Sequence, residues 1–231
     1  MPIDAAEFSD QGLRWEMEDR HVLLVEEEEI LGAVFDGHNG AWVAELAARL
    51  LPQLRHRSPA ETLVMIHRQT LGLPGGACAV VFRLRGDWLE VANVGDAELA
   101  LVTGDDVRLL TQRHRLDDPE EQARVLARGG LIQGPYAIDP RTLRGLMPTR
   151  ALGDHELERI GIVCEPHRWS GRFQEGWLVA ACDGLWDVVS AGELPPLLHG
   201  SAEDVARRLA REALQVRGST DNLTILVVRR T

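Results

Sequence analysis

The chain has 231 residues, of which 45% are hydrophobic and 26% are charged. This composition supports one large domain or two small ones with a sizeable core, and it excludes an intrinsically disordered chain. The formal net charge of −11 argues against a protein that binds the phosphate backbone of nucleic acids, so we expect no nucleic-acid partner.

The three cysteines lie far apart in the sequence, which predicts neither a disulfide framework nor a zinc site. Their apolar neighbours predict core positions for all three. The opening residues, MPIDAAEFSD, lack the basic and apolar regions of a signal peptide. No apolar run approaches the ~20 residues of a membrane span. We therefore expect a cytoplasmic protein in a reducing compartment, with no membrane partner.

Three helices are predicted in the first two thirds of the chain. Apolar residues recur at helical spacing over 42–54 and predict the first helix. The second helix starts at Ser58-Pro59-Ala60-Glu61, which offers an N-cap, a proline at the first helical position and a capping-box glutamate. The third helix opens at Asp118-Pro119 and is closed by Gly129-Gly130.

Strand-like runs alternate with these helices and are joined by short turns. They cover 30–35, 77–84, 87–94, 97–103, 107–111, 176–182 and 222–228, and helical segments begin near Ser190 and Ser201. Sequential strands with short turns favour an α+β domain with antiparallel sheets over a doubly wound parallel sheet. Because no linker or repeat divides the chain, we expect a single domain over 1–231.

The segment from about 133 to 150 is irregular and rich in Gly, Pro and Arg. It is long for a structureless connection, so we interpret it as a functional flap that selects the substrate. Arg141, Arg144 and Arg150 in this flap could meet an acidic phosphopeptide, although a solvated loop is the commoner explanation for such arginines.

Four aspartates stand at the ends of predicted strands. Asp36, Asp96 and Asp183 each close an apolar run, and Asp221 opens the last one. In antiparallel neighbours the end of one strand and the start of the next lie at the same edge, so the four side chains could converge. Four adjacent carboxylates would raise one another's pKa unless cations lay between them, and oxygen ligands suit magnesium or manganese. A separate turn role remains the simpler explanation for any one of these residues, but the shared pattern favours a metal site.

Eight segments resemble, in order along nearly the whole chain, the metal-dependent protein phosphatases of the 2C type, a family of protein Ser/Thr phosphatases. They are GLRWEMEDRH, VFDGHNG, VANVGDAELAL, LLTQRH, ARGGLI, PTRALGD, LVAACDGLWDVVS and GSTDNLTILVV. The resemblance implies a central sandwich of two antiparallel β-sheets flanked by α-helices. It also implies hydrolysis of phosphoserine and phosphothreonine in proteins by a metal-activated water, with two Mn²⁺ or Mg²⁺ ions in a binuclear centre.

The resemblance assigns the metal ligands by position. Asp36 would bridge both ions, and the carbonyl of Gly37 would bind one of them, where a glycine lets the backbone approach closely. Asp183 and Asp221 match the ligands of the other ion. Asp96 matches, with Asp183 and with Asp187 as a candidate, a weaker third-metal site of many relatives. Glu18 and Asp19 match acidic residues that hold metal-bound waters.

Two further residues carry catalytic roles by the same resemblance. Arg14 matches the arginine that binds the substrate phosphate, and its planar guanidinium suits a bidentate grip on phosphoryl oxygens. His38 matches a histidine that is proposed to protonate the leaving group. The chain departs from the usual family pattern at Asn39, where relatives often have glycine, and at Ala97-Glu98, where they often have Ser-Arg.

The predicted partners are phosphorylated Ser/Thr proteins, with a cognate Ser/Thr kinase as a candidate, and we expect a monomer. Two alternatives to the enzyme remain. A catalytically weak relative could serve as a sensor or scaffold, although such relatives commonly lose ligand positions that are all filled here. A two-metal phosphodiesterase that acts on nucleic acid is opposed by the acidic net charge.

Overall fold

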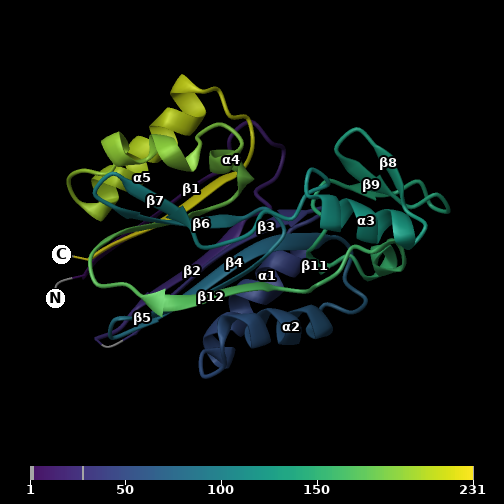
Figure 1. Ribbon diagram of the computed structural model, residues 1–231, viewed down its shortest axis with the longest axis horizontal. Coiled ribbons are helices and arrows are strands. Elements are labelled where there is room, and N and C mark those ends of the chain that lie inside the picture. The colour runs from purple at the N-terminus through teal and green to yellow at the C-terminus, as the bar shows by residue number, and fades with distance from the viewer. Residues whose placement is uncertain (1–2, 28, 231) are drawn as a thin grey trace.

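The computed structural model describes residues 3–27 and 29–230 and shows two antiparallel sheets packed face to face (Figure 1). The first sheet has the order β1 (Ile3–Asp10), β14 (Leu223–Arg230), β13 (Gly176–Ala181), β6 (Glu98–Thr103) and β7 (Asp106–Leu109). The second has the order β12 (His167–Arg172), β5 (Trp88–Val94), β4 (Gly76–Arg85), β3 (Glu29–His38) and β2 (Arg20–Val25), and β11 (Leu152–Gly153) pairs with β4. The α+β sandwich expected from the sequence is confirmed.

Helices cover the two outer faces of the sandwich (Figure 1). The second sheet carries α1 (Trp42–Leu50) and α2 (Pro59–Gln69), and the first carries α4 (Asp183–Trp186) and α5 (Ala202–Arg211). Short 3-10 turns cover Leu51–Leu54, His155–Ile160, Ala191–Glu193 and Pro195–Leu197, and a π-helical turn, Glu212–Val216, follows α5. None of the helices in the described ranges is long and apolar enough to cross a bilayer.

The sequence predicted where helices start more accurately than where they end or which of their residues are buried. The capping box predicted at Ser58 forms, because the Ser58 N–H donates to Glu61 Oε2 at 3.1 Å and the Glu61 N–H donates to Ser58 Oγ at 3.4 Å. The first helix is shorter than predicted, since Pro52 cannot continue it and the chain turns into a 3-10 helix. Trp42 is 61% exposed and does not belong to the buried face that the spacing predicted.

The segment after α3 (Pro119–Ala127) is more regular than its composition suggested. It forms a small antiparallel sheet of β8 (Leu131–Gln133), β9 (Tyr136–Ile138) and β10 (Gly145–Leu146). This sheet and α3 lie beside the end of the sandwich that is far from the two termini (Figure 1). The predicted flap is therefore a compact addition to the sandwich, and its role in selecting a substrate remains a prediction.

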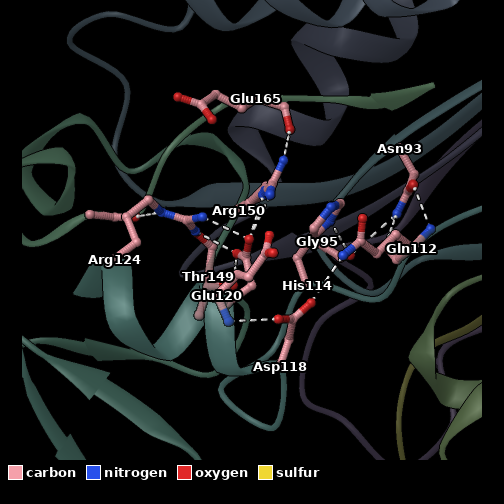
Figure 2. A network of polar contacts seen from close by, with 12 residues as sticks. Asn93, Gly95, Gln112, His114, Asp118, Glu120, Arg124, Thr149, Arg150 and Glu165 are labelled. Atoms are coloured by element: carbon pink, nitrogen blue, oxygen red, sulfur yellow. Dashed lines mark hydrogen bonds and ion pairs between the residues drawn. The ribbon is translucent and has the colours of Figure 1, made fainter. Parts of the chain in front are cut away.

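A buried glutamate ties this addition to the sandwich. Glu121 has a side chain that is 1% exposed, and it accepts hydrogen bonds from Arg124 Nη1 at 2.7 Å and from Arg150 Nε at 3.0 Å. Arg150 also donates to the Glu165 carbonyl at 2.6 Å (Figure 2). The interpretation of Arg150 as a contact to a phosphopeptide is wrong, because its guanidinium is committed to this internal network. Arg144 pairs with Glu156.

Replacement of Glu121 by glutamine should destabilise the protein. Burial raises the pKa of Glu121, but hydrogen bonds from Arg124, Arg150 and Thr149 outweigh burial and hold the pKa well below its usual range. The contribution to stability is therefore present above the unfolded-state pKa of about 4.3 and is lost as pH falls through the folded-state pKa. We expect E121Q to lower the free energy of unfolding by about 3 kcal/mol at pH 7, since it leaves two arginines without their counter-charge.

Urea denaturation at pH 7 and at pH 3.5 measures this effect. The difference between wild type and E121Q should shrink at the lower pH, where wild-type Glu121 begins to be protonated as unfolding proceeds. The matched control is E120Q, because Glu120 is the exposed neighbour on the same helix. A similar loss in both variants would contradict the structural role of the Glu121 network.

Candidate metal centre and active site

The strand ends bring the predicted aspartates together at one end of the sandwich. Asp36 lies near the end of β3, Asp96 follows β5, Asp183 follows β13, and Asp221 precedes β14. Carboxylate oxygens of Asp36, Asp96 and Asp183 lie within 4.8 Å of one another. All four aspartates line one pocket of about 220 Å³, together with Arg14, Gly37, His38 and Glu18. The convergence inferred from the antiparallel pattern is therefore present in the structure.

The cluster is electrostatically costly in the metal-free protein. Burial, together with the charges of Asp183, Asp19, Asp96 and Asp221, raises the pKa of Asp36 well above its usual range. Burial, followed by repulsion from its acidic neighbours, raises the pKa of Asp183 to about 7. Raised values at several carboxyls of one pocket indicate that a positive charge is needed to keep them all ionised.

Asp19 gives a direct test of whether the site suits a metal ion. Its side chain is buried, and neither carboxylate oxygen has a hydrogen-bond partner among the residues that the structure describes. Burial raises the pKa of Asp19 to about 6. A buried acceptor without a partner is unfavourable, and a cation or the waters around a cation would satisfy it. An oxygen-rich donor set with orphaned oxygens fits hard divalent ions.

Glu18 is placed differently from its neighbour. Its carboxylate accepts the Gly40 N–H, and its own backbone N–H donates to Asn222 Oδ1 at 2.8 Å. These bonds fix the loop between β1 and β2 against the turn after β3 and against the residue that precedes β14. Glu18 still lines the pocket, so its predicted contact with metal-bound water stays a prediction.

Two backbone positions in the turn after β3 explain its sequence. A Cβ added to Gly37 would lie 2.5 Å from the Glu18 carbonyl oxygen, so the close approach of the two segments requires glycine there. Asn39 has a φ of 57°, in the left-handed region that glycine and asparagine tolerate best. The departure from glycine at this position is therefore compatible with the same turn.

Arg14 stands at the rim of the pocket. Its Nη2 lies 2.5 Å from Asp221 Oδ2, and 58% of its side chain is exposed. An exposed guanidinium that lines the pocket can exchange a carboxylate for a phosphate group without leaving a buried charge unpaired.

His38 has a carboxylate partner that the sequence analysis missed. His38 Nε2 lies 2.6 Å from Oδ2 of Asp154, which is buried and adopts a left-handed backbone conformation with a φ of 48°. Nδ1 of His38 has no hydrogen-bond partner among the described residues, and His38 lines the pocket. Asp154 ends the segment PTRALGD, but the sequence holds no local signal that links it to a histidine 116 positions away.

Arg115 is the second residue that the sequence analysis missed. It directly follows the segment LLTQRH, and its guanidinium reaches the carboxylates of Asp96, Asp183 and Asp187. A positive charge from the chain itself therefore lies on one side of the acidic cluster.

Removal of one charge from the cluster should separate stability from activity. We expect D183N without metal to melt no lower than wild type at pH 8, because the change relieves repulsion. The raised pKa of Asp183, about 7, means that wild type recovers stability as pH falls and this carboxyl takes up a proton. Any advantage of D183N should therefore shrink at pH 5, as measured by thermal unfolding in EDTA.

The same variant should hydrolyse a phosphoserine peptide, the substrate that the resemblance implies, at least about a hundredfold more slowly at saturating Mn²⁺, since a predicted ligand is gone. Activity near that of wild type would remove Asp183 from the metal site. A D183N protein that melts well below wild type at both pH values would show that the carboxylate stabilises the fold instead.

Comparisons with known proteins point to one family and one fold. The sequence model of the family described as "Protein phosphatase 2C" matches residues 55–223. The chain is 34% identical to the "Probable protein phosphatase 2C 59" of Arabidopsis thaliana, over 96% of this chain and 78% of that protein. It is 32% identical to a "Protein kinase and PP2C-like domain-containing protein" of the same plant, over 98% of this chain and 39% of that protein. The solved structure of serine-threonine phosphatase 2C from Toxoplasma gondii shares the fold, with a TM-score of 0.82 and 22% identity over 99% of this chain and 95% of that chain.

Proposed function

The chain belongs to the protein phosphatase 2C family of metal-dependent protein Ser/Thr phosphatases, and from that premise we propose that its acidic pocket holds two divalent ions, Mn²⁺ or Mg²⁺. Asp36, Gly37, Asp183 and Asp221 would hold them, and Glu18 and Asp19 would bind their waters. The observation that carries this proposal is the meeting of four strand-end aspartates with Arg14 and His38 in one pocket. The comparisons are with protein phosphatases, and they offer no support for a phosphodiesterase that acts on nucleic acid.

Divalent ions in this pocket would supply a water of lowered pKa and positive charge beside the phosphoryl group. The chain's own groups bind and orient the substrate. Arg14 would turn from Asp221 to the phosphoryl oxygens, where its planar N–H groups can bind two oxygens at once. It would also stabilise the charge that gathers on those oxygens as the ester bond breaks.

His38 would donate the proton that the leaving serine or threonine oxygen needs. Asp154 binds Nε2 and so fixes the orientation of the ring, which leaves Nδ1 as the nitrogen available to the pocket. We therefore assign the donated proton to Nδ1 and treat Asp154 as a residue that positions His38. The carboxylate is itself held in a buried site, so the ring is oriented by a rigid partner.

The proposed substrates are phosphorylated Ser/Thr proteins, and the flap at about 133–150 is the proposed selector. Tyr136, Gly145, Leu146, Met147 and Pro148 of this segment line the pocket beside the aspartates. A cognate kinase is a further proposal, supported by a relative whose name joins a protein kinase to a PP2C-like domain. Three free cysteines support our proposal of a reducing, cytoplasmic location, and we propose a monomer.

For Arg14→Ala we expect mainly a higher KM for a phosphopeptide, with a smaller loss in kcat. The variant loses a phosphate contact that exists in the ground state as well as some stabilisation of the transition state. Steady-state kinetics with a phosphoserine peptide at saturating Mn²⁺ measures both constants. If KM and kcat both stay at their wild-type values, Arg14 does not belong to the active site.

The role of His38 can be tested by the choice of leaving group. A serine alkoxide leaves poorly and needs a proton, whereas nitrophenolate leaves well and needs little help. We expect H38A to slow hydrolysis of a phosphoserine peptide by about a hundredfold or more, the usual scale for general acid catalysis, and to slow nitrophenyl phosphate hydrolysis far less. D154N should show the same pattern with a smaller loss, because it disturbs only the orientation of the ring.

Metal affinity must be measured for both variants, since a weakened metal site would slow both substrates alike. Equal losses on the two substrates at saturating metal would contradict the general-acid role of His38. A D154N protein with wild-type activity on the phosphopeptide would show that Asp154 does not position the ring.

A further inference from the structure

Arg115 occupies the part of the acidic pocket where a third ion would bind. Its Nε donates to Asp96 Oδ2 at 2.6 Å, and its Nη2 donates to Asp183 Oδ2 at 3.2 Å. Nη2 also donates to Asp187 Oδ2 at 3.1 Å, and Nη1 lies 3.0 Å from Asp187 Oδ1. One guanidinium thus bonds to all three carboxylates that the family resemblance assigned to a third metal.

The chemistry of these contacts leaves little room for a second cation. Magnesium binds its oxygen ligands at about 2.0–2.1 Å in a near-octahedral shell, so it would need the same lone pairs that the guanidinium N–H groups now occupy. The Arg115 side chain is only 13% exposed, and an arginine cannot lose its charge in a protein. A divalent ion at Asp96 and Asp183 would therefore have to expel a largely covered, permanently charged group.

The backbone on both sides of Arg115 is fixed, which keeps its side chain in the cluster. Figure 2 shows that His114 bonds to Gly95 and that Asn93 bonds to Gln112. The His114 N–H and Nδ1 both meet the Gly95 carbonyl at 3.0 Å, and the His114 carbonyl accepts the Thr149 N–H at 2.9 Å. Arg115 itself forms a β-bridge with Pro148.

We propose that Arg115 is a built-in cation that replaces a third metal ion and holds Asp96 and Asp183 in position, so that this phosphatase works with two ions. The inference rests on the proposed two-ion core, but it is tested by a difference in the number of bound ions between variants and not by the number in wild type alone. The core requires that wild type bind two ions, whereas the inference concerns the further ion that is gained when the guanidinium is removed.

The experiment measures bound Mn²⁺ per protein by equilibrium dialysis and elemental analysis across a range of free metal. Wild type should bind two ions, and Arg115→Met should bind three, because Asp96 and Asp183 then lose the guanidinium that pairs with them, while Asp187 keeps only Arg113. Arg115→Lys should stay at two, since it keeps a positive charge at the same place. Arg113→Met is the matched control, because Arg113 bonds to Asp187 at 2.5 Å and to neither Asp96 nor Asp183.

Thermal unfolding adds a readout that does not depend on activity. Saturating Mn²⁺ should raise the Tm of R115M by more than it raises the Tm of wild type or R113M, since one more ion binds only the folded protein. If R115M does not fold, the ion counts of wild type and R115K still test the inference, because three bound ions in either protein would overturn it.

A difference of one ion between R115M and wild type supports the inference, and equal counts overturn it. Three ions in wild type, or three in R115K but not in wild type, overturn it as well. A wild-type count below two would contradict the proposed two-ion core instead, and it would appear in the absolute count rather than in the difference between variants.

Discussion

Repulsion between carboxylates at one end of the sandwich is the constraint on which the rest of the structure depends. Asp36, Asp96 and Asp183 are held within 4.8 Å by strands that end at the same edge. No local preference of the chain would bring them together, because like charges at this distance are unfavourable in a partly buried site. The packed sheets must supply the free energy that keeps them there, and cations must offset what remains.

Arginine side chains of the chain itself lie beside some of these carboxylates but not beside others. Arg14 pairs with Asp221 at the exposed rim, and Arg115 bonds to Asp96 and Asp183 on one flank. Asp19, whose carboxylate lies close to that of Asp36, has no such partner among the described residues. Positive charge from the chain is therefore distributed unevenly over the carboxylates. The carboxylates with the least of it lie where the resemblance to the family places the binuclear centre.

The sequence predicted the features that depend on neighbouring residues. The capping box at Ser58 and the strand-end aspartates follow from local patterns, and both are present. The partners of His38 and Arg150 could not be predicted, because Asp154 and Glu121 lie far away in the sequence and only the folded chain brings them close. The small sheet around 133–150 was missed for a related reason: its strands of two or three residues are too short to show a period.

Affinity for metal and stability of the metal-free protein are linked through the same charges. Ions that relieve repulsion between the carboxylates bind more tightly for that reason. Because such ions bind only the folded protein, their binding also shifts the folding equilibrium toward the folded state. A carboxylate that is neutralised beforehand contributes less to this gain, and Arg115 neutralises part of the cluster in advance. Carboxylates that keep their repulsion, such as Asp36, destabilise the empty site and give the bound ions their affinity. A site of this kind favours function over stability, which is common where activity depends on a strained arrangement of charge.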